Sequence, residues 1–411
     1  MKTLAQIGGG RGEALCRTAM QLSLQLELAA IVGAGNVLPD ATVLPANITE
    51  LSAILRYANS YKIPVAPHGG PAKNITGVNL RTSRLNQVKE HIWQDMTCTV
   101  EAGTTWSAMQ TILSQHHQFV ALDPLSPDTA TVGGIVATND SGALRMKYGS
   151  LRDLIIGMTI VLADGTIAKT GGKVVKNVAG YDLHKLMTGA HGTLGVIAEV
   201  TFRLHAIPAH TRSVTISGIT ALDAQPLGSL LLELTASQLS LHALQLRTVR
   251  PSGSQATFAL DVSLATMPSV LTHQLTQLET MAAAHSLTIE DAAPDVWSAR
   301  EAVHASAYVV KAAMLPTDIA PISTLISTLS GTAVTQAGGI MTAAFATPES
   351  IAPLRREVES AHGHLTILRQ PESSTLPVWG PAPDTLHLMQ QIKQRFDPNG
   401  ILNPGCFLDG I

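Results

Sequence analysis

A glycine-rich stretch near the N-terminus has the composition of a loop that binds phosphate. Residues 65–74 read VAPHGGPAKN: a short apolar run ends at His68, two glycines follow, and Lys73 and Asn74 come soon after. Glycines lack the Cβ atom that would keep a ligand away from backbone N–H groups, and consecutive N–H groups in a turn can surround an anion. On these residues alone, the stretch is either a phosphate loop or an ordinary glycine-rich turn.

The elements around this stretch exclude two common nucleotide sites. Asn47 and Glu50 form a plausible capping box, and the apolar residues from 51 to 61 recur at helical spacing. IPVAP then predicts a short strand, so the order is helix, strand, loop. A dinucleotide-binding fold needs strand, loop, helix, and a triphosphate loop needs G-x-x-x-x-G-K-[ST], which the sequence lacks. The glycines of IGGGRG at 7–12 follow too few residues for a strand to precede them.

A second group of small residues lies between 121 and 149, where the sequence reads ALDPLSPDTATVGGIVATNDSGALRMKYG. The segments 131–134 and 139–142 either offer a flat surface to a ring or a pyrophosphate, or form two ordinary turns. Next, residues 151–170 predict a β-hairpin around Asp164-Gly165.

Composition limits the class of protein. Of the 411 residues, 45% are hydrophobic and 14% are charged, which suits a large core in two or three domains. The net charge of −3 argues against nucleic-acid binding. Cys16, Cys98 and Cys406 lie far apart without a C-x-x-C pair. This excludes an iron–sulfur cluster or a zinc ribbon built by the chain alone, and it indicates a reduced, cytoplasmic protein.

The first 35 residues are predicted to be an N-terminal extension. Residues 13–34 are rich in apolar side chains but interrupted by charges, so we expect neither a transmembrane span nor a signal peptide. Leu22 and Leu26 fit one face of a helix, whereas Leu22, Leu24, Leu26 and Leu28 fit a strand equally well. The sequence leaves that choice open.

The motifs from residue 121 onward resemble those of a known flavoprotein family. The array is similar to the FAD-binding domain of the FAD-linked oxidases, the vanillyl-alcohol-oxidase/PCMH family. VVKNVAGYDLHKLMTGAHGTLGVIAEV at 174–200 and IKQRFDPNGILNPG at 392–405 resemble the glycolate oxidase and D-lactate dehydrogenase branch. VWGPAP at 378–383 is similar to the smaller flavin subunit of bacterial glycolate oxidase, the GlcE type. The resemblance covers about residues 36–411 and is loose between 204 and 392.

This resemblance implies that FAD is the cofactor and that the glycine-rich stretch wraps its diphosphate. NAD is not expected to bind. The residues implied to line the cofactor site are His68, Gly69, Gly70, Pro71, Ala72, Lys73, Asn74, Pro124, Thr131, Gly133, Gly134, Asn139, Ser141, Gly142, Tyr148, Gly149, Gly192, Gly195, Ile197 and Asn403.

The stretch departs from the family pattern at two positions. The family loop usually has a third glycine and then Ser or Thr before the lysine, where this chain has Pro71 and Ala72. Pro71 removes an N–H donor and Ala72 removes a hydroxyl, so either the affinity for FAD is lower or other donors compensate. Family members with covalent flavin carry a histidine near the end of this loop, whereas His68 stands at its start. The resemblance therefore implies non-covalent FAD.

The resemblance also implies an α+β fold and a domain order. A two-subdomain PCMH-type FAD-binding domain would span residues 36–207, an α+β cap domain 208–375, and the segment 376–411 would return to the FAD-binding domain. Between 208 and 375, apolar segments such as SLLLELTA and IMTAAFAT alternate with helix-like stretches such as PSVLTHQLTQLETMAAAH, a mixture typical of an α+β domain.

Catalytic residues are not evident in the sequence. Oxidation of a 2-hydroxy acid needs a carboxylate clamp, a base and a flavin that accepts hydride. The patterns G-H-x-G-D-G-N-x-H and E-H-G-x-G of the catalytic relatives are missing, and HGH at 362–364 has no carboxylate–histidine cluster beside it, so no metal site is predicted. The basic residues that either clamp a carboxylate or form ordinary salt bridges are Arg247, Arg300, Lys311 and Arg369, with Lys311 and Arg369 as weak catalytic candidates.

The function implied by the resemblance is that of the FAD-binding subunit of a glycolate oxidase or dehydrogenase complex. Its partners would be a second, catalytic flavin subunit and an iron–sulfur subunit, in the cytoplasm or on a membrane surface through the complex. One alternative is a self-sufficient FAD-dependent D-2-hydroxy-acid dehydrogenase, such as a D-lactate dehydrogenase. The other is a non-catalytic assembly subunit that keeps the fold. The substrate, the electron acceptor and the oligomeric state stay open.

Overall fold

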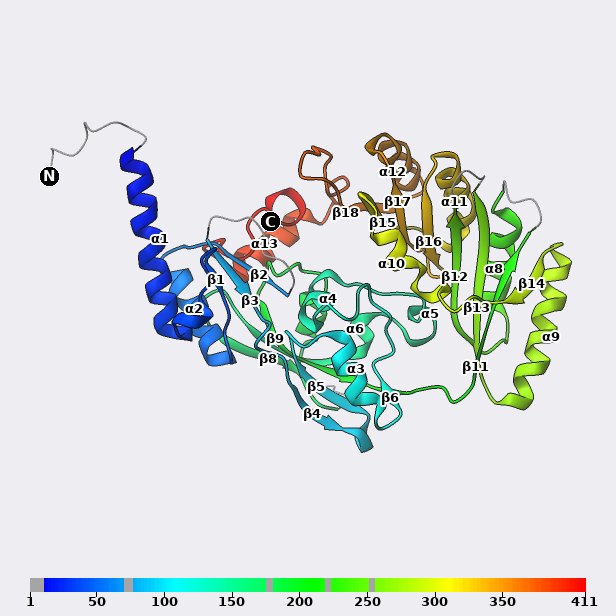
Figure 1. The fold of residues 1–411 in the computed structure, drawn as a ribbon, viewed down its shortest axis with the longest axis horizontal. Helices are drawn as coiled ribbons and strands as arrows, with labels where there is room; N and C mark the ends of the chain where they lie inside the picture. The colour runs from blue at the N-terminus through cyan, green and yellow to red at the C-terminus, as the bar shows by residue number, and fades with distance from the viewer. Residues whose placement is uncertain (1–10, 70–76, 175–179, 219–222, 251–255) are drawn as a thin grey trace.

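The computed structural model describes residues 11–69, 77–174, 180–218, 223–250 and 256–411, with side chains from residue 22 onward. Three sheets carry the fold (Figure 1): a small parallel sheet, a five-stranded antiparallel sheet and an eight-stranded antiparallel sheet, with a two-stranded ribbon beside them. The mixture of helices and largely antiparallel strands confirms the predicted α+β class.

The small sheet packs against two helices near the N-terminus. Its strands run in the order β1-β3-β2, and all neighbours are parallel. The Glu50 N–H donates to Asn47 Oδ1 at 2.9 Å, which confirms the predicted helix start. Leu51, Ile54 and Leu55 are fully buried, and each such side chain stabilises the fold by about 2 kcal/mol. The elements are α1 (Arg11–Val32), η1 (Ala34–Asn36), β1 (Thr42–Val43), α2 (Ile48–Ser60), β2 (Val65–His68) and β3 (Val78–Arg81).

The five-stranded sheet has the order β4-β5-β9-β7-β8. Strands β7 and β8 form the predicted hairpin, and Gly165 in its turn has a φ of +84° that favours glycine. The elements are β4 (Val88–Ile92), η2 (Trp93–Asp95), β5 (Thr97–Glu101), α3 (Trp106–Ser114), β6 (Gln118–Phe119), α4 (Val132–Thr138), α5 (Arg145–Tyr148), α6 (Leu151–Leu154), β7 (Ile155–Val161), β8 (Ile167–Gly171), α7 (Leu183–Met187), β9 (Val196–Arg203) and β10 (His205–Ala206).

The eight-stranded sheet lies within residues 211–369, which we call the cap region. Its order is β14-β11-β13-β12-β16-β17-β15-β18. Helices α8, α9, α11 and α12 cover one face, while α10 lies on the side that faces the five-stranded sheet (Figure 1). The elements are β11 (Thr211–Ser217), α8 (Gln225–Ala236), β12 (Leu241–Val249), β13 (Thr257–Ala265), α9 (Pro268–Ala284), β14 (Thr288–Asp291), η3 (Val296–Ser298), α10 (Ala299–His304), β15 (Tyr308–Ala313), η4 (Pro316–Asp318), α11 (Ile319–Thr328), β16 (Thr332–Gln336), β17 (Ile340–Phe345), η5 (Pro348–Ser350), α12 (Ile351–Ser360) and β18 (His364–Arg369).

After the cap region, the chain returns to the small sheet. It forms α13 (Leu386–Phe396) and η6 (Leu408–Gly410), and between them Leu402 makes a parallel bridge to Val65 of β2. The Val65 N–H donates to Ile401 O at 2.7 Å, and the Asn403 N–H donates to Val65 O at 2.9 Å. This backbone pairing places the C-terminal segment as predicted.

Three segments are helical where the sequence left the conformation open or favoured another one. The segment that fitted a helix and a strand equally well is helical, as α1, and its residues Leu28 and Val32 are buried beside α2. SLLLELTA is part of helix α8, because its continuous apolar run supplies Leu230, Leu231 and Leu234 to the core between helix and sheet. The predicted turn at 131–134 is the start of helix α4. Among the described helices, none is long and apolar enough to cross a lipid bilayer.

Candidate cofactor site

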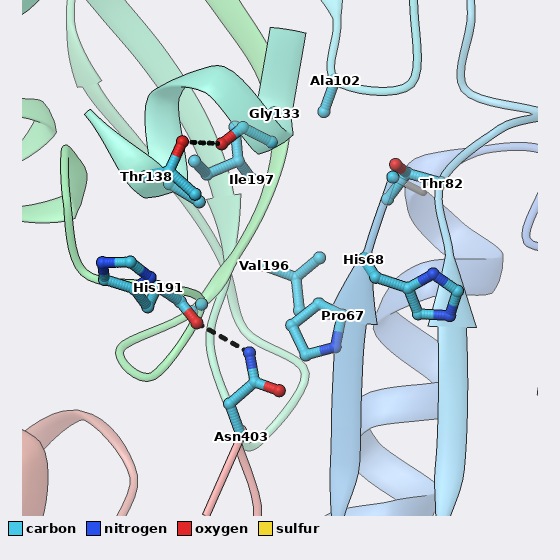
Figure 2. A pocket seen from close by; sticks show the side chains of 15 residues that line it. Pro67, His68, Thr82, Ala102, Gly133, Thr138, His191, Val196, Ile197 and Asn403 are labelled. Atoms are coloured by element: carbon cyan, nitrogen blue, oxygen red, sulfur yellow. Dashed lines mark hydrogen bonds between the residues drawn. The ribbon is translucent and has the colours of Figure 1, made fainter. Parts of the chain in front are cut away.

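One cavity brings together residues from the small sheet, helix α4, strand β9 and the C-terminal segment (Figure 2). These elements are distant in sequence and meet only because the two sheets pack side by side. The lining residues are Pro67, His68, Gly69, Thr82, Ala102, Gly133, Gly134, Ala137, Thr138, His191, Gly192, Gly195, Val196, Ile197 and Asn403. Eight of the predicted site residues are among them: His68, Gly69, Gly133, Gly134, Gly192, Gly195, Ile197 and Asn403.

Glycines let the backbones around this cavity approach one another closely. A Cβ atom on Gly69 would lie 2.0 Å from Thr131 Oγ1, and one on Gly133 would lie 2.9 Å from the Ala102 Cβ. Gly192 has a φ of +73°, and a Cβ there would lie 2.8 Å from Asn403 Nδ2. Larger residues at these positions would clash, so the walls of the cavity depend on glycine itself.

Helix α4 supplies one wall of the cavity. The Gly134 N–H donates to Thr131 Oγ1 at 3.2 Å, so Thr131, a predicted site residue, acts from beneath as the helix cap. Gly133, Gly134, Ala137 and Thr138 line the cavity from this helix. The Thr138 hydroxyl donates back to Gly134 O at 2.9 Å (Figure 2), so its one donor is used within the helix. The wall is therefore small and largely apolar, as a flat ring requires.

A buried ion pair positions the C-terminal side of the cavity. Lys393 Nζ donates to Asp397 Oδ2 at 2.6 Å and to the carbonyls of Thr193 and Leu402 at 2.9 and 2.8 Å. The Asp397 carboxylate in turn accepts the N–H groups of Ile401 and Leu402. A charged pair that is this fully hydrogen-bonded holds the residues before Asn403 in one conformation.

Asn403 closes the cavity from below in Figure 2. Its Nδ2 donates to His191 O at 2.7 Å, while its Oδ1 is buried without a hydrogen-bond partner among the described residues. The His191 ring stacks on Phe407 and meets the edge of Trp379, which comes from the VWGPAP segment. An unpaired buried oxygen costs about 1–3 kcal/mol, a penalty that a ligand N–H would relieve.

These features fit FAD. The cavity offers backbones without Cβ atoms, an apolar wall of Ala102, Ala137, Val196 and Ile197, and the buried Asn403 oxygen. A diphosphate needs the first feature, a flat ring needs the second, and the polar edge of a ring needs the third. Gly70, Pro71, Ala72, Lys73 and Asn74 lie outside the described residues.

The other predicted site residues lie elsewhere. Pro124 and Gly142 line a second cleft, of about 560 Å³, between helix α3 and helix α10 of the cap region. There the space where a Gly142 Cβ would sit is taken by the Asp123 carboxyl group, 2.2 Å away. Tyr148 and Gly149 line a third cleft, beside β7 and α7. Tyr148 contacts His242 of the cap region rather than the cofactor cavity.

Asn139 and Ser141 directly follow the cavity wall. Asn139 ends α4 with a φ of +49°, and Lys311 Nζ of the cap region donates to its carbonyl oxygen at 3.2 Å. Ser141 is buried, and its carbonyl accepts hydrogen bonds from Arg300 and Gln336 of the cap region. Both residues therefore connect the cavity wall to the cap region.

The structure distinguishes among the four basic candidates. Arg247 makes two hydrogen bonds to Asp261 and Arg300 is bonded to Asp140, so both follow the salt-bridge alternative. Arg369 is exposed at the end of β18. Lys311 alone of the four is half-buried beside the cavity wall without an ion pair among the described residues. No group of three or more potential metal-ligating side chains occurs among the described residues.

Sequence reasoning missed seven lining residues: Pro67, Thr82, Ala102, Ala137, Thr138, His191 and Val196. Ala137, Thr138 and His191 are close in sequence to predicted positions and could have been included. Thr82 and Ala102 lie just after β3 and β5, and only the packing of the two sheets brings them together. No local signal marks such residues.

Asp123 gives a pH-dependent prediction. Burial raises the pKa of this carboxyl from 3.8 to about 6, although Arg300 and the N–H groups of Leu144 and Ala143 oppose the shift. Between these values the folded protein binds more protons than the unfolded chain. We therefore expect the free energy of unfolding of the wild type, compared with that of Asp123→Asn, to fall as pH rises from about 4 to about 6. The fall should be at most about 3 kcal/mol, and above about pH 6 the difference between the two proteins should stay constant. Urea unfolding of both proteins across this range checks it, and a wild-type advantage that grows with pH would contradict it.

Two family models match parts of the chain. An FAD binding domain matches residues 39–171, and the C-terminal domain of FAD linked oxidases matches residues 381–406. The first match contains the glycine-rich stretch and helix α4, and the second contains Asn403. Both therefore fall on segments that line the cavity.

Three relatives of known activity each match a little under half of this chain. A mitochondrial D-lactate dehydrogenase [cytochrome] from Arabidopsis thaliana is 39% identical over 46% of this chain and 34% of its own length. Glycolate oxidase subunit GlcD from Bacillus subtilis is 36% identical over 41% and 37%. A D-2-hydroxyglutarate dehydrogenase from Stutzerimonas stutzeri is 30% identical over 43% and 40%. The matched part thus spans roughly two fifths or less of these relatives' length.

Solved structures share the fold over nearly the whole chain. A 4-ethylphenol oxidase from Gulosibacter chungangensis has a TM-score of 0.71 at 16% identity and covers 94% of this chain and 97% of its own. A chitooligosaccharide oxidase has a TM-score of 0.62 at 16% identity and covers 88% and 89%. At this identity the likeness concerns the fold, and it includes the cap region. The two domain matches show that the chain carries an FAD binding domain and the C-terminal domain of FAD linked oxidases, with FAD as the cofactor, and the solved structures show that its fold is that of these two oxidases.

Proposed function

We propose that this chain is the FAD-binding subunit of a glycolate oxidase or dehydrogenase complex. The complex oxidises glycolate or a similar 2-hydroxy acid and passes the electrons to an iron–sulfur subunit. The observation that carries the proposal is the position of Lys311, a half-buried cation of the cap region whose Nζ lies 3.2 Å from Asn139 O at the end of the cofactor-lining helix.

The electrostatics of Lys311 suit a carboxylate ligand. Burial lowers its pKa, Arg300 and Arg145 lower it further, and Asp140 acts in the opposite direction. A carboxylate beside Nζ would favour the charged ammonium and offset part of the desolvation cost. It would also fix one end of a 2-hydroxy acid, so that C2 points toward the cofactor wall. FAD bound in this chain would accept the hydride from C2 only if the chain is self-sufficient; in the complex, the second flavin subunit would carry out that oxidation.

The relatives' names support this substrate class and the assignment to a complex. They include D-lactate and D-2-hydroxyglutarate dehydrogenases and a glycolate oxidase subunit. The sequence lacks the histidine-rich motifs with which catalytic relatives activate the hydroxyl, so we assign that step to a second flavin subunit. Its three distant cysteines cannot build a cluster by themselves, so we assign onward electron transfer to an iron–sulfur partner.

A self-sufficient D-2-hydroxy-acid dehydrogenase is the second candidate. The same Lys311 favours it, because a half-buried cation beside the cavity wall could serve as the carboxylate clamp, one of the three groups such an enzyme needs. This candidate requires a base from the chain itself, and His304 of α10 is the residue we would assign. Burial lowers the pKa of His304, and the charges of Arg369, Asp140 and Arg300 act on it.

Turnover separates the two candidates. We expect the purified, FAD-loaded chain to show little or no dye-linked oxidation of glycolate or D-lactate, because it lacks a placed base for the hydroxyl proton. The complex purified from native cells through a tag on this chain is expected to oxidise glycolate at about 1 s⁻¹ or faster, within the usual enzymatic range. Steady-state assays of both samples measure this.

Turnover of about 1 s⁻¹ by the chain alone would contradict the subunit proposal and favour the second candidate. In that case Lys311→Met should abolish the activity even at an FAD concentration that saturates the variant, and Lys169→Met on the distant strand β8 serves as the matched control.

A further inference from the structure

Arg300 crosses from the cap region into the loop that ends the cofactor wall. It stands on α10, and only 8% of its surface is exposed. Its guanidinium donates to Asp140 Oδ1 at 3.0 Å and Oδ2 at 3.3 Å, to Asp123 O at 2.8 Å, and to Ser141 O. One side chain thus satisfies four oxygen atoms that lie 159 to 177 residues away in sequence.

Two further cap-region side chains hold the same turn. Gln336 Nε2 of β16 donates to Ser141 O at 2.7 Å, and Lys311 Nζ of β15 donates to Asn139 O at 3.2 Å. Three elements of the cap region therefore hold three consecutive residues, 139–141. We call this set of hydrogen bonds the clamp.

The clamp acts on the last turn of the cofactor-lining helix. Asn139 ends α4, and the preceding carbonyls of Val136 and Ala137 accept the N–H groups of Gly189 and His191 at 2.9 Å each. His191 and Ala137 both line the cofactor cavity. A shift of residues 139–141 would therefore move α4 and the 189–191 turn together, and with them two walls of the cavity.

The geometry requires arginine. The planar guanidinium presents its donors in a fixed fork, whereas a lysine ammonium is a single point that cannot reach Asp140, Asp123 O and Ser141 O at once. The bond to Ser141 O is buried and those to Asp140 and Asp123 O are partly buried, so acceptors that lose these donors are destabilised.

We propose that Arg300 is a positioning residue of the cofactor site, and that through the clamp it makes docking of the cap region and binding of FAD mutually stabilising. Such coupling is reciprocal: if the docked cap region strengthens FAD binding, FAD strengthens docking by the same factor. If the clamp merely stabilised the fold, FAD binding would not change the stability of cap-region docking.

The test compares Arg300→Lys with Arg247→Lys in the full chain. Arg247 is a half-buried arginine with two hydrogen bonds to a buried carboxylate, at 2.6 and 2.8 Å, but its partner Asp261 lies within the cap region itself. Both variants should melt at lower temperature. FAD affinity, measured by flavin fluorescence, should weaken at least about tenfold in Arg300→Lys and stay within about twofold of wild type in Arg247→Lys.

Hydrogen exchange gives the second readout. In wild type, FAD should slow amide exchange in α10, although α10 does not line the cofactor cavity, and this protection should be lost in Arg300→Lys. Equal FAD affinity in the two variants, or FAD protection of α10 that survives Arg300→Lys, would overturn the proposal. If Arg300→Lys does not fold, Gln336→Met removes one bond of the clamp and should weaken FAD binding a few-fold, and an unchanged affinity would overturn the proposal equally.

Discussion

Gly134→Val is expected to weaken FAD binding at least about a hundredfold while the protein stays folded. Gly134 lines the cavity, so the two methyl groups of valine would occupy space that the cofactor needs. Outside its chain neighbours and the backbone of α4, the new Cβ would have one described atom within 4 Å, Thr131 Oγ1 at 3.2 Å, so a shift of a few tenths of an ångström by this side chain accommodates it. Within helix α4 the exchange is tolerated, because valine has a somewhat better helix propensity than glycine, by about 0.3 kcal/mol.

Gly338→Val is the matched control. It lies in the turn between β16 and β17 of the cap region, and no described atom outside its immediate neighbours lies within 4 Å of its added Cβ. Titration of both variants with FAD, followed by flavin fluorescence, and circular dichroism of the apo-proteins provide the measurement. If Gly134→Val kept wild-type affinity, the cofactor would not lie against α4.

From the sequence, Gly133 and Gly134 of α4 were predicted to line the cofactor site, but the helical conformation of this segment was not predicted. Its two glycines suggested a turn, and the cost of glycine in a helix is about 1 kcal/mol each. In the fold, the Thr131 cap and the burial of Val132, Ile135 and Val136 outweigh that cost. Tertiary packing therefore made a helix where local propensity favoured a turn, although the expected small-residue surface is present.

Contacts between residues far apart in the sequence placed several site residues, and the sequence alone does not reveal such contacts. Thr82 and Ala102 line the cavity only because the small sheet and the five-stranded sheet pack side by side. Arg300 looked like any basic residue, because its partner Asp140 lies 160 residues earlier. By contrast, Asn47 with Glu50 and the Asp164-Gly165 hairpin depend on contacts between near neighbours, and both were predictable.

The same limit applies to the predicted site as a whole. Backbone positions that must be glycine, such as Gly192 with its positive φ, are recognisable by residue type. Pro124, Gly142, Tyr148 and Gly149 belong to the same motifs but line other clefts: Pro124 lies before α4, and the other three lie in the chain that leaves the cavity after Asn139. A motif therefore predicted which segments take part, and packing decided which side chains face the cofactor.

The central claim is that this cavity holds one FAD without a covalent bond, and the purified protein tests it directly. His68 lies on the strand that leads into the cavity, at the start of the glycine-rich stretch rather than near its end. We therefore expect the protein to be yellow, or to become so with FAD, and to bind one FAD per chain.

The measurement is acid or heat precipitation followed by absorbance and chromatography of the two fractions. We expect all of the flavin to appear in the supernatant as FAD, because only hydrogen bonds and packing hold it. Flavin that stays with the precipitated protein would contradict non-covalent binding. A protein that remains colourless after incubation with FAD would contradict the cofactor site itself.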